Sequence, residues 1–374
     1  MANILDYVAW RGDLTFAERP FNDVDNLILA ELAYTNFKGI VSDMPVAVSD
    51  AWKLYEADGR DQSSMSCDPR AILEVCADSR RFGTILVHNY ADIFDHEDTR
   101  QFGAMTFYLE DGTIYVAFRG TDTTMAGWRE DLNFSYMMAT PAQLDAVNYL
   151  NSVCASTDCP VRVGGHSKGG NLAMFAAAFC KTAYRDRIIQ VYSNDGPGFN
   201  EVIASSDGYR GILGKVKLII PDGSVVGILL SNKQEKTVVK SNGKDATAQH
   251  IPYSWQVERD GFEEADRQSS TSLLLDRTLD EWVDNLNSEE RAGFVSAIFD
   301  ALDASGVKCL EDLSHDRWKT YNAILKAMGD LAPERKDIVK GVVLRLAAAG
   351  RDAIWDEAKS RFLKRGEEEK TVTV

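Results

Sequence analysis

The sequence is poor in cysteine and shows none of the spacings that make cysteine structural. Its 374 residues include six cysteines and no C-x-x-C pair, so neither a disulfide framework nor a zinc ribbon is indicated. Basic residues are also in deficit, 41 against 57 acidic ones, which gives a formal net charge of −16. Because such an acidic surface repels phosphate backbones, we expect no nucleic-acid partner.

Long apolar runs are missing as well. No stretch reaches the roughly 20 consecutive apolar residues that a membrane-spanning helix needs, and the first residues show no basic segment followed by an apolar run. We therefore expect a cytoplasmic protein without a stable membrane anchor. Hydrophobic residues still form 45% of the chain, which is enough for a sizeable globular core.

The patterns that are present divide the chain into blocks. Residues 1–80 carry helical periodicity, and residues 81–265 alternate short β-rich runs with helical stretches, as in a parallel sheet. Asp111-Gly112 between two early runs predicts an antiparallel hairpin. Only helical patterns remain beyond residue 265. The sequence thus predicts an α/β domain over 1–265, with a mostly parallel central sheet flanked by helices, and a helical C-terminal region over 266–374.

One short segment carries a recognisable chemical motif. The sequence VRVGGHSKGGNLA, residues 161–173, places Ser167 between a β-rich run and a helical pattern, in the form G-x-S-x-G. Glycine is required at 165 and 169 because a Cβ atom there would collide with the neighbouring strand and helix. The chain has neither of the common glycine motifs that bind phosphate. We therefore predict that Ser167 is a nucleophile.

A serine hydroxyl needs a base and an orienting acid to act as a nucleophile. In the strand-turn-helix hydrolases the chain order is serine, acid, histidine. His166 adjoins the serine and is expected to point away from it, which leaves His250 and His315. His250 follows a β-rich run by a short polar loop, whereas His315 lies among the C-terminal helical patterns. His250 is therefore the predicted base.

Two aspartates qualify as the acid. Asp222 follows the run VKLII and Asp195 follows the run IIQVYS, so both belong at strand ends, where catalytic loops gather in α/β sheets. Asp222 comes one strand before the histidine and is preferred. Asp195 is the alternative, and its other role would be to organise the turn at residues 196–198.

An acyl-transfer site also needs hydrogen-bond donors for the oxyanion. One is the backbone N–H of Lys168, directly after the nucleophile, and the second belongs in the loop after an earlier strand. That loop contains Gly120, which permits close backbone approach, and Thr121, which offers an N–H and a hydroxyl. The Lys168 side chain is expected either on the solvated surface or near the site, where it would favour an acidic substrate.

Four segments together resemble a known family. YVAFRGTD (115–122), GGHSKGGNLA (164–173), PDGSVVG (221–227) and His250 before a downstream tryptophan are similar to the class 3, fungal-type lipases of the α/β-hydrolase superfamily. The likeness is greatest to an uncharacterised bacterial branch. It covers roughly residues 20–260 and implies an α/β-hydrolase fold.

The resemblance also implies roles for individual residues. It makes Ser167, Asp222 and His250 a catalytic triad, with Thr121 and Lys168 as the oxyanion pair. Residues 122–142 lie where such lipases carry a lid. Side chains suited to a lid or an acyl pocket in or near that stretch are Met125, Trp128, Phe134, Met137 and Met138.

The expected activity follows from these assignments. The chain is predicted to be a serine hydrolase that cleaves small-molecule or lipid-like acyl esters through an acyl-enzyme, without a cofactor. The acidic stretch from His88 to Asp98 matches no familiar metal-ligand spacing and is interpreted as a solvated loop. A thioesterase, an amidase or an acyltransferase would share the triad, and a non-catalytic binding protein would share the fold.

Overall fold

A computed structural model describes residues 1–42, 44–59, 68–95, 100–121, 133–230, 234–244, 246–269, 289–293 and 295–296. The chain divides into two compact units, residues 1–268 and 269–374. The predicted helical C-terminal region lies almost entirely outside the described residues, so the account below concerns the first unit.

The described elements alternate much as the sequence patterns predict. The helices are α1 (Ile4–Arg11), α2 (Asp23–Leu32), α3 (Val48–Ala57), α4 (Pro69–Ala77), α6 (Pro141–Ser156), α7 (Lys168–Phe179), α8 (Thr182–Arg185), α9 (Glu201–Ala204), α10 (Asp207–Arg210) and α11 (Ala246–His250). The strands are β1 (Val46–Ala47), β2 (Leu86–Asp95), β3 (Arg100–Tyr108), β4 (Ile114–Phe118), β5 (Val161–His166), β6 (Ile188–Asn194), β7 (Val216–Pro221), β8 (Lys236–Val239), β9 (Val257–Glu258) and β10 (Gly261–Phe262).

Strands β1 to β8 form one sheet in sequence order. The first four pair antiparallel, and β4 to β8 pair parallel. The predicted hairpin is confirmed: β3 and β4 are joined by a tight turn in which Gly112 has a φ of +78° and the Asp111 carboxylate accepts the Thr113 N–H at 3.0 Å. The parallel half places the ends of β4, β5, β6 and β7 at one edge.

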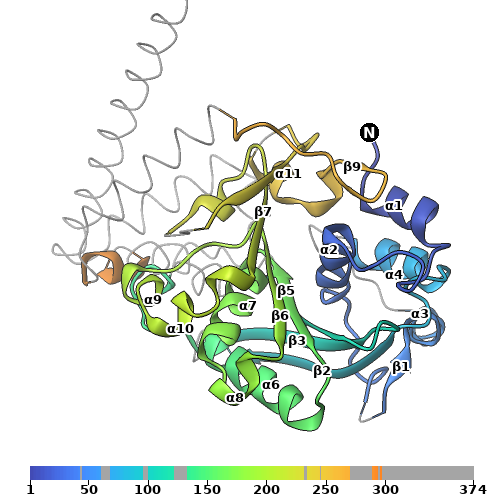
Figure 1. Cartoon of the computed structure of the whole chain (residues 1–374), viewed down its shortest axis with the longest axis horizontal. Helices are drawn as coiled ribbons and strands as arrows, with labels where there is room; N and C mark the ends of the chain where they lie inside the picture. Colours follow the sequence, from blue (N-terminus) through green and yellow to red (C-terminus); the bar gives the residue numbers. More distant parts are fainter. Residues whose placement is uncertain are drawn as a thin grey trace, which may run out of the picture. The chain divides into compact units, whose positions relative to one another are not determined.

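Helices cover both faces of this sheet (Figure 1). Strand β4 shows why, because its side chains alternate between two cores. Ile114, Val116 and Phe118 face the core built with α6 and α7. Tyr115 and Ala117 face the core built with α1 to α4. A strand buried on both faces is apolar throughout, as a covered parallel sheet requires.

The N-terminal helices contain a buried ion pair. Asn22 caps α2 by accepting the N–H groups of Val24 and Asp25. The Asp25 carboxylate then accepts from Arg81, with 2.6 Å between Oδ2 and Nη2, and both side chains are at most 1% exposed. This pair ties α2 to the segment that precedes β2.

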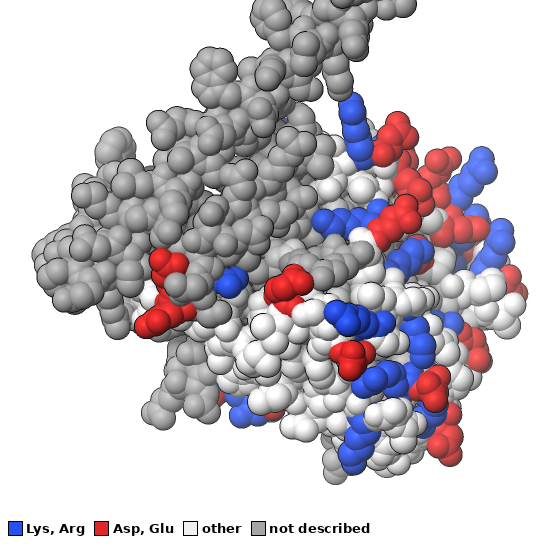
Figure 2. All heavy atoms as spheres, turned by 60° about the vertical axis from the view of Figure 1, so that its left-hand side comes forward, with Lys and Arg blue, Asp and Glu red and all other residues white. Residues whose placement is uncertain are grey.

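The described surface is mixed in charge. Acidic and basic side chains alternate over the face shown in Figure 2. Within the described ranges, no helix is both long and apolar enough to cross a bilayer.

Candidate active site

Ser167 occupies a strained turn between β5 and α7. Its φ is +57° and its ψ is −131°, a conformation that costs a non-glycine residue energy and is found where a site requires it. The Ser167 N–H donates to the carbonyl of Asn194 at 2.9 Å, which fixes the turn to the end of β6. Ser167 is buried, with 8% of its surface exposed, so only a small part of the serine is accessible at the sheet edge.

The flanking glycines are required by the closeness of strand and helix, as the motif predicts. A Cβ at Gly165 would lie 2.4 Å from the carbonyl carbon of Gly169, and a Cβ at Gly169 would lie 2.1 Å from the oxygen of Phe118. No neighbouring backbone could yield that much space. The turn therefore places the serine at the N-terminus of α7, where free N–H groups favour negative charge.

The acid and the base meet beside this turn. His250 Nδ1 lies 2.6 Å from Asp195 Oδ2, and the aspartate is fully buried while the histidine side chain is 20% exposed. Asp195 follows β6 with a φ of +48°. Its other oxygen, Oδ1, accepts from the Ser224 hydroxyl and from the Gly227 N–H at 3.0 Å. The carboxylate is thus held on both oxygens and directed at the imidazole.

This geometry corrects the preferred acid. Asp222 does follow β7, but the carboxylate on His250 belongs to Asp195, the alternative. Asp222 donates its backbone N–H to Val239, and its Oδ1 is buried without a hydrogen-bond partner. The loop after β7 contributes Ser224 and Gly227 as donors to Asp195. It supports the acid instead of supplying it.

The end of β4 lies directly against the serine turn. A Cβ at Gly120 would be 2.6 Å from the carbonyl oxygen of His166 and 3.1 Å from Cβ of Ser167. Only glycine allows this approach. It brings the next residue, Thr121, to the same side of the sheet edge as Lys168, the first residue of α7.

The Lys168 side chain is not on the surface. It is 1% exposed, and its Nζ donates to the carbonyl of Gln101 at 3.0 Å. The lysine therefore connects the start of α7 to β3, and the expectation of a solvated side chain is wrong. The Asp195 carboxylate is held by His250, Ser224 and Gly227.

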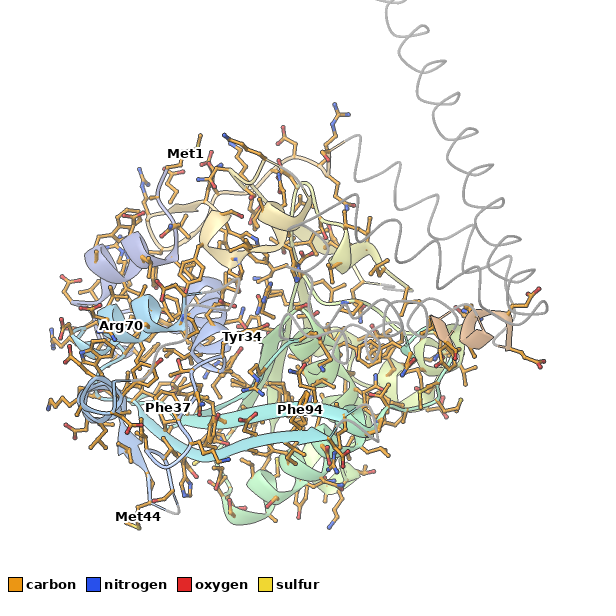
Figure 3. The ribbon with its side chains drawn as sticks, turned by 180° about the vertical axis from the view of Figure 1, so that it is seen from behind. Met1, Tyr34, Phe37, Met44, Arg70 and Phe94 are labelled. Carbon is orange, nitrogen blue, oxygen red and sulfur yellow. The ribbon has the colours of Figure 1, made fainter. Side chains whose placement is uncertain are left out.

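His166 and Tyr34 are site neighbours that the sequence analysis missed. The His166 ring lies 4.6 Å from that of His250, centroid to centroid. Tyr34, labelled in Figure 3, follows α2, and its hydroxyl is 3.2 Å from His166 Nδ1. Burial holds the pKa of His166 well below its usual range, and the neighbouring His250 adds to this effect. Its position next to the serine was the only available signal.

Other predicted site residues stand apart from this group or lie outside the description. Phe134 is buried, Met137 is half-buried and Met138 is 63% exposed. Met125 and Trp128 lie outside the described residues. Where the structure describes the chain, no cluster of three potential metal ligands occurs. The predicted lid stays a prediction.

The predicted nucleophile and the predicted base are not joined by a hydrogen bond among the described contacts. Among the described contacts, none links the Ser167 hydroxyl to His250. Such contacts are often long in a free enzyme and shorten when substrate binds. The serine, the histidine and the aspartate nevertheless come from neighbouring segments at one edge of the sheet, at the ends of β5 and β6 and in α11 (Figure 1).

Two solved structures are among those to which the chain is similar. A fungal lipase–inhibitor complex, described as a basis for interfacial activation, is 14% identical over 64% of this chain and 81% of that chain, with a TM-score of 0.39. A Rhizomucor miehei lipase–propeptide complex is 13% identical over 63% of this chain and 80% of that chain, with a TM-score of 0.37. No curated protein matches the chain.

The sheet order and the serine turn give the fold class. A mostly parallel sheet covered by helices on both faces, with a strand-serine-helix turn at its edge, is the predicted α/β-hydrolase fold. The family profile described as Mbeg1-like matches residues 76–300, more than half of the chain. The chain is therefore a lipase-like α/β-hydrolase, and it belongs to the Mbeg1-like family.

Proposed function

We propose that the chain is a serine hydrolase that cleaves carboxylic esters, with Ser167, His250 and Asp195 as its catalytic triad. The observation that carries this proposal is the buried Asp195 carboxylate on His250 Nδ1, at 2.6 Å, beside a serine held at a φ of +57°. The bond between acid and base is the one that serine catalysis requires, and the serine turn lies at the same edge of the sheet.

The geometry supports the following sequence of steps. The Ser167 hydroxyl attacks the ester carbonyl while His250 Nε2 takes its proton, and Asp195 stabilises the imidazolium through Nδ1–H. The alcohol leaves with that proton, and an acyl-enzyme forms. Water then attacks the acyl group, with His250 again as the base, and the carboxylic acid is released.

The oxyanion of each tetrahedral intermediate needs donors that are already in place. Lys168 and Thr121 are the proposed pair, each through its backbone N–H. The Lys168 N–H belongs to the first turn of α7, directly after the serine. The close approach at Gly120 supports the placement of Thr121 near Ser167.

The substrate class follows from the same parts. Esters of acyl chains are the simplest substrates for such a site, because a serine nucleophile with a histidine base and an aspartate performs acyl transfer. We propose a small-molecule or lipid-like acyl ester, in accord with the lipase-like family.

Labelling of the full chain with a fluorophosphonate probe tests this function, followed by peptide mass spectrometry. We expect modification at Ser167, loss of modification in His250→Ala, and p-nitrophenyl ester turnover that Ser167→Ala abolishes without a lower melting temperature. Ser156→Ala is the matched control, since Ser156 on α6 bonds only the carbonyl of Val153. A folded protein that neither labels nor turns over ester would overturn the proposal in favour of a binding role.

A further inference from the structure

His166 makes a hydrogen bond to the backbone of the proposed base. Its Nε2 lies 2.9 Å from the carbonyl oxygen of His250. A carbonyl oxygen only accepts, so the proton of a neutral His166 must be on Nε2. Nδ1 is then an acceptor, and the Tyr34 hydroxyl 3.2 Å away is placed to donate to it.

The same tyrosine hydroxyl touches the strand end on the other side of the serine. A Cβ at Gly120 would lie 2.1 Å from the Tyr34 oxygen, so the hydroxyl fills the space that a larger residue would need. Gly120 directly precedes Thr121, the proposed oxyanion donor. Tyr34 thus contacts both the oxyanion strand and the histidine that holds the base.

We propose that Tyr34 and His166 are positioning residues for the hydrolysis: Tyr34 O–H donates to His166 Nδ1, and His166 Nε2–H donates to the carbonyl of His250. This inference rests on the proposed function. The chain of donors continues from His250 Nδ1–H to Asp195. The His250 carbonyl therefore sets the tautomer of His166, the Tyr34 hydroxyl matches that tautomer as a donor to Nδ1, and His166 in turn holds the place of the base.

The rate of a catalysed reaction depends strongly on the position of the base. A displacement of about 1 Å at a reacting group can cost roughly 100-fold in rate. His250 is the last residue of α11, a short helix, and its side chain is 20% exposed. Its two described anchors are the side-chain bond to Asp195 and the backbone bond from His166. Loss of the second would let the imidazole pivot about the first.

His166 must also remain uncharged for this role. During the reaction a positive charge forms on His250, whose ring is 4.6 Å from that of His166. A second imidazolium at that distance would oppose it. The Glu31 carboxyl is the nearest charged group on α2, with Oε1 3.4 Å from Nδ1. That carboxylate on its own would favour a charged ring, whereas the burial of the His166 side chain, which is 4% exposed, favours the neutral form.

Two substitutions at one position separate positioning from structural support. His166→Gln keeps an N–H that can reach the His250 carbonyl, whereas His166→Leu removes it at similar volume. On a p-nitrophenyl ester we expect His166→Leu to lower kcat roughly 100-fold with KM nearly unchanged, and His166→Gln to recover most of that loss. Tyr34→Phe should lower kcat by a smaller factor, because His166 keeps its bond to His250.

His88→Gln is the matched histidine control. His88 lies on β2, three places from β5 in the strand order, with its ring against Tyr108. We expect its kcat to equal that of the native chain. If His166→Gln and His166→Leu lose the same activity and the same melting temperature, His166 is only a core residue and the inference fails.

A readout without substrate keeps the inference separate from the proposed function. Nitrogen-15 NMR of histidine-labelled protein reports which ring nitrogen carries the proton, and the His166 signals are those absent from His166→Gln. We expect protonation at Nε2 and a shift of the His250 signals in His166→Leu but not in His88→Gln. Protonation of His166 at Nδ1, or unmoved His250 signals, would overturn the inference even in an inactive protein.

Discussion

Two buried aspartates in this chain hold a basic side chain, and they do so in opposite ways. Asp25 on α2 binds Arg81, and Asp195 after β6 binds His250. Both carboxylates are fully buried and accept additional hydrogen bonds. The difference lies in what the basic partner does with the rest of its donors.

Arg81 uses its donors completely within the fold. Besides Asp25, its guanidinium donates to four backbone carbonyls, those of Leu14, Thr15, Arg19 and Pro20. It also lies over the ring of Phe16, 4.1 Å from the centroid. A permanently charged group whose donors are all used in this way has a structural role. It tethers residues 14–20 to α2 and has no capacity left for chemistry.

His250 uses only one side of its ring. Nδ1 is bound to Asp195, and among the described contacts Nε2 has no hydrogen bond. The side chain is 20% exposed, against 1% for Arg81. A titratable group that is oriented on one nitrogen and accessible on the other can carry a proton. Both pairs have a buried carboxylate, and the partial exposure of His250 is what distinguishes the candidate active site from the structural ion pair.

The largest expected effect comes from removing the charge of each candidate acid in turn. Asp195→Asn leaves the shape of the side chain but removes the charge that holds the imidazolium, so we expect kcat to fall by about 10⁴-fold. Asp222→Asn should change kcat far less, because its carboxylate does not contact His250. Steady-state kinetics on a p-nitrophenyl ester measures both, and the opposite ranking would restore Asp222 as the acid.

Removal of Arg81 tests how much the buried Asp25–Arg81 ion pair stabilises the fold. Arg81→Met leaves a buried carboxylate and four backbone carbonyls without their donor, so the free energy of unfolding should fall by about 3 to 5 kcal/mol. Urea denaturation measures this loss. The labelling of Ser167 per folded molecule should be unchanged at low temperature, and a selective loss of labelling would mean that the two regions are coupled.

The smallest expected effect is on the pH dependence of the free energy of unfolding. Because burial lowers the pKa of His166, the unfolded chain, with a pKa of about 6.5, binds a proton that the folded chain excludes. The stability that depends on neutral His166 is complete above about pH 6.5 and is lost as the pH falls below it. His166→Gln removes this linkage.

The measurement is the free energy of unfolding between about pH 6.5 and pH 5. Its pH dependence should be less steep in His166→Gln by up to about 1.4 kcal/mol per pH unit. Glu31 and His250, which face the same ring, are present in both proteins, and His166 is the residue that differs. Equal slopes would show that the buried ring takes up its proton without cost.

Much of this architecture could be predicted from the sequence because it rests on local signals. The Asp111-Gly112 turn, the helix cap at Asn22 and the glycines around Ser167 are each decided by a few neighbouring residues. His250 could be predicted by chain order, since most other histidines come before the serine or adjoin it. The cytoplasmic location, the bacterial source and the lid stay predictions.

The proposed acid could not be predicted because the contact between Asp195 and His250 joins distant segments. Chain order and the resemblance both favoured Asp222, at a strand end one strand before the histidine. The deciding facts are the φ of +48° at Asp195 and the two donors that reach it from residues 224 and 227. The glycine after Asp195 was one sequence signal that this loop lies against the serine turn. A Cβ at Gly196 would lie 2.7 Å from the carbonyl oxygen of Ser167.

The placement of the acid after β6 also changes the entropy of building the site. Ser167 and Asp195 are 28 residues apart and follow the adjacent parallel strands β5 and β6, whereas Asp195 and His250 are 55 residues apart. Each doubling of a closed loop costs about 0.6 kcal/mol more in chain entropy. The nucleophile and the acid are therefore brought together by a compact local unit, and the larger ordering cost falls on the histidine alone.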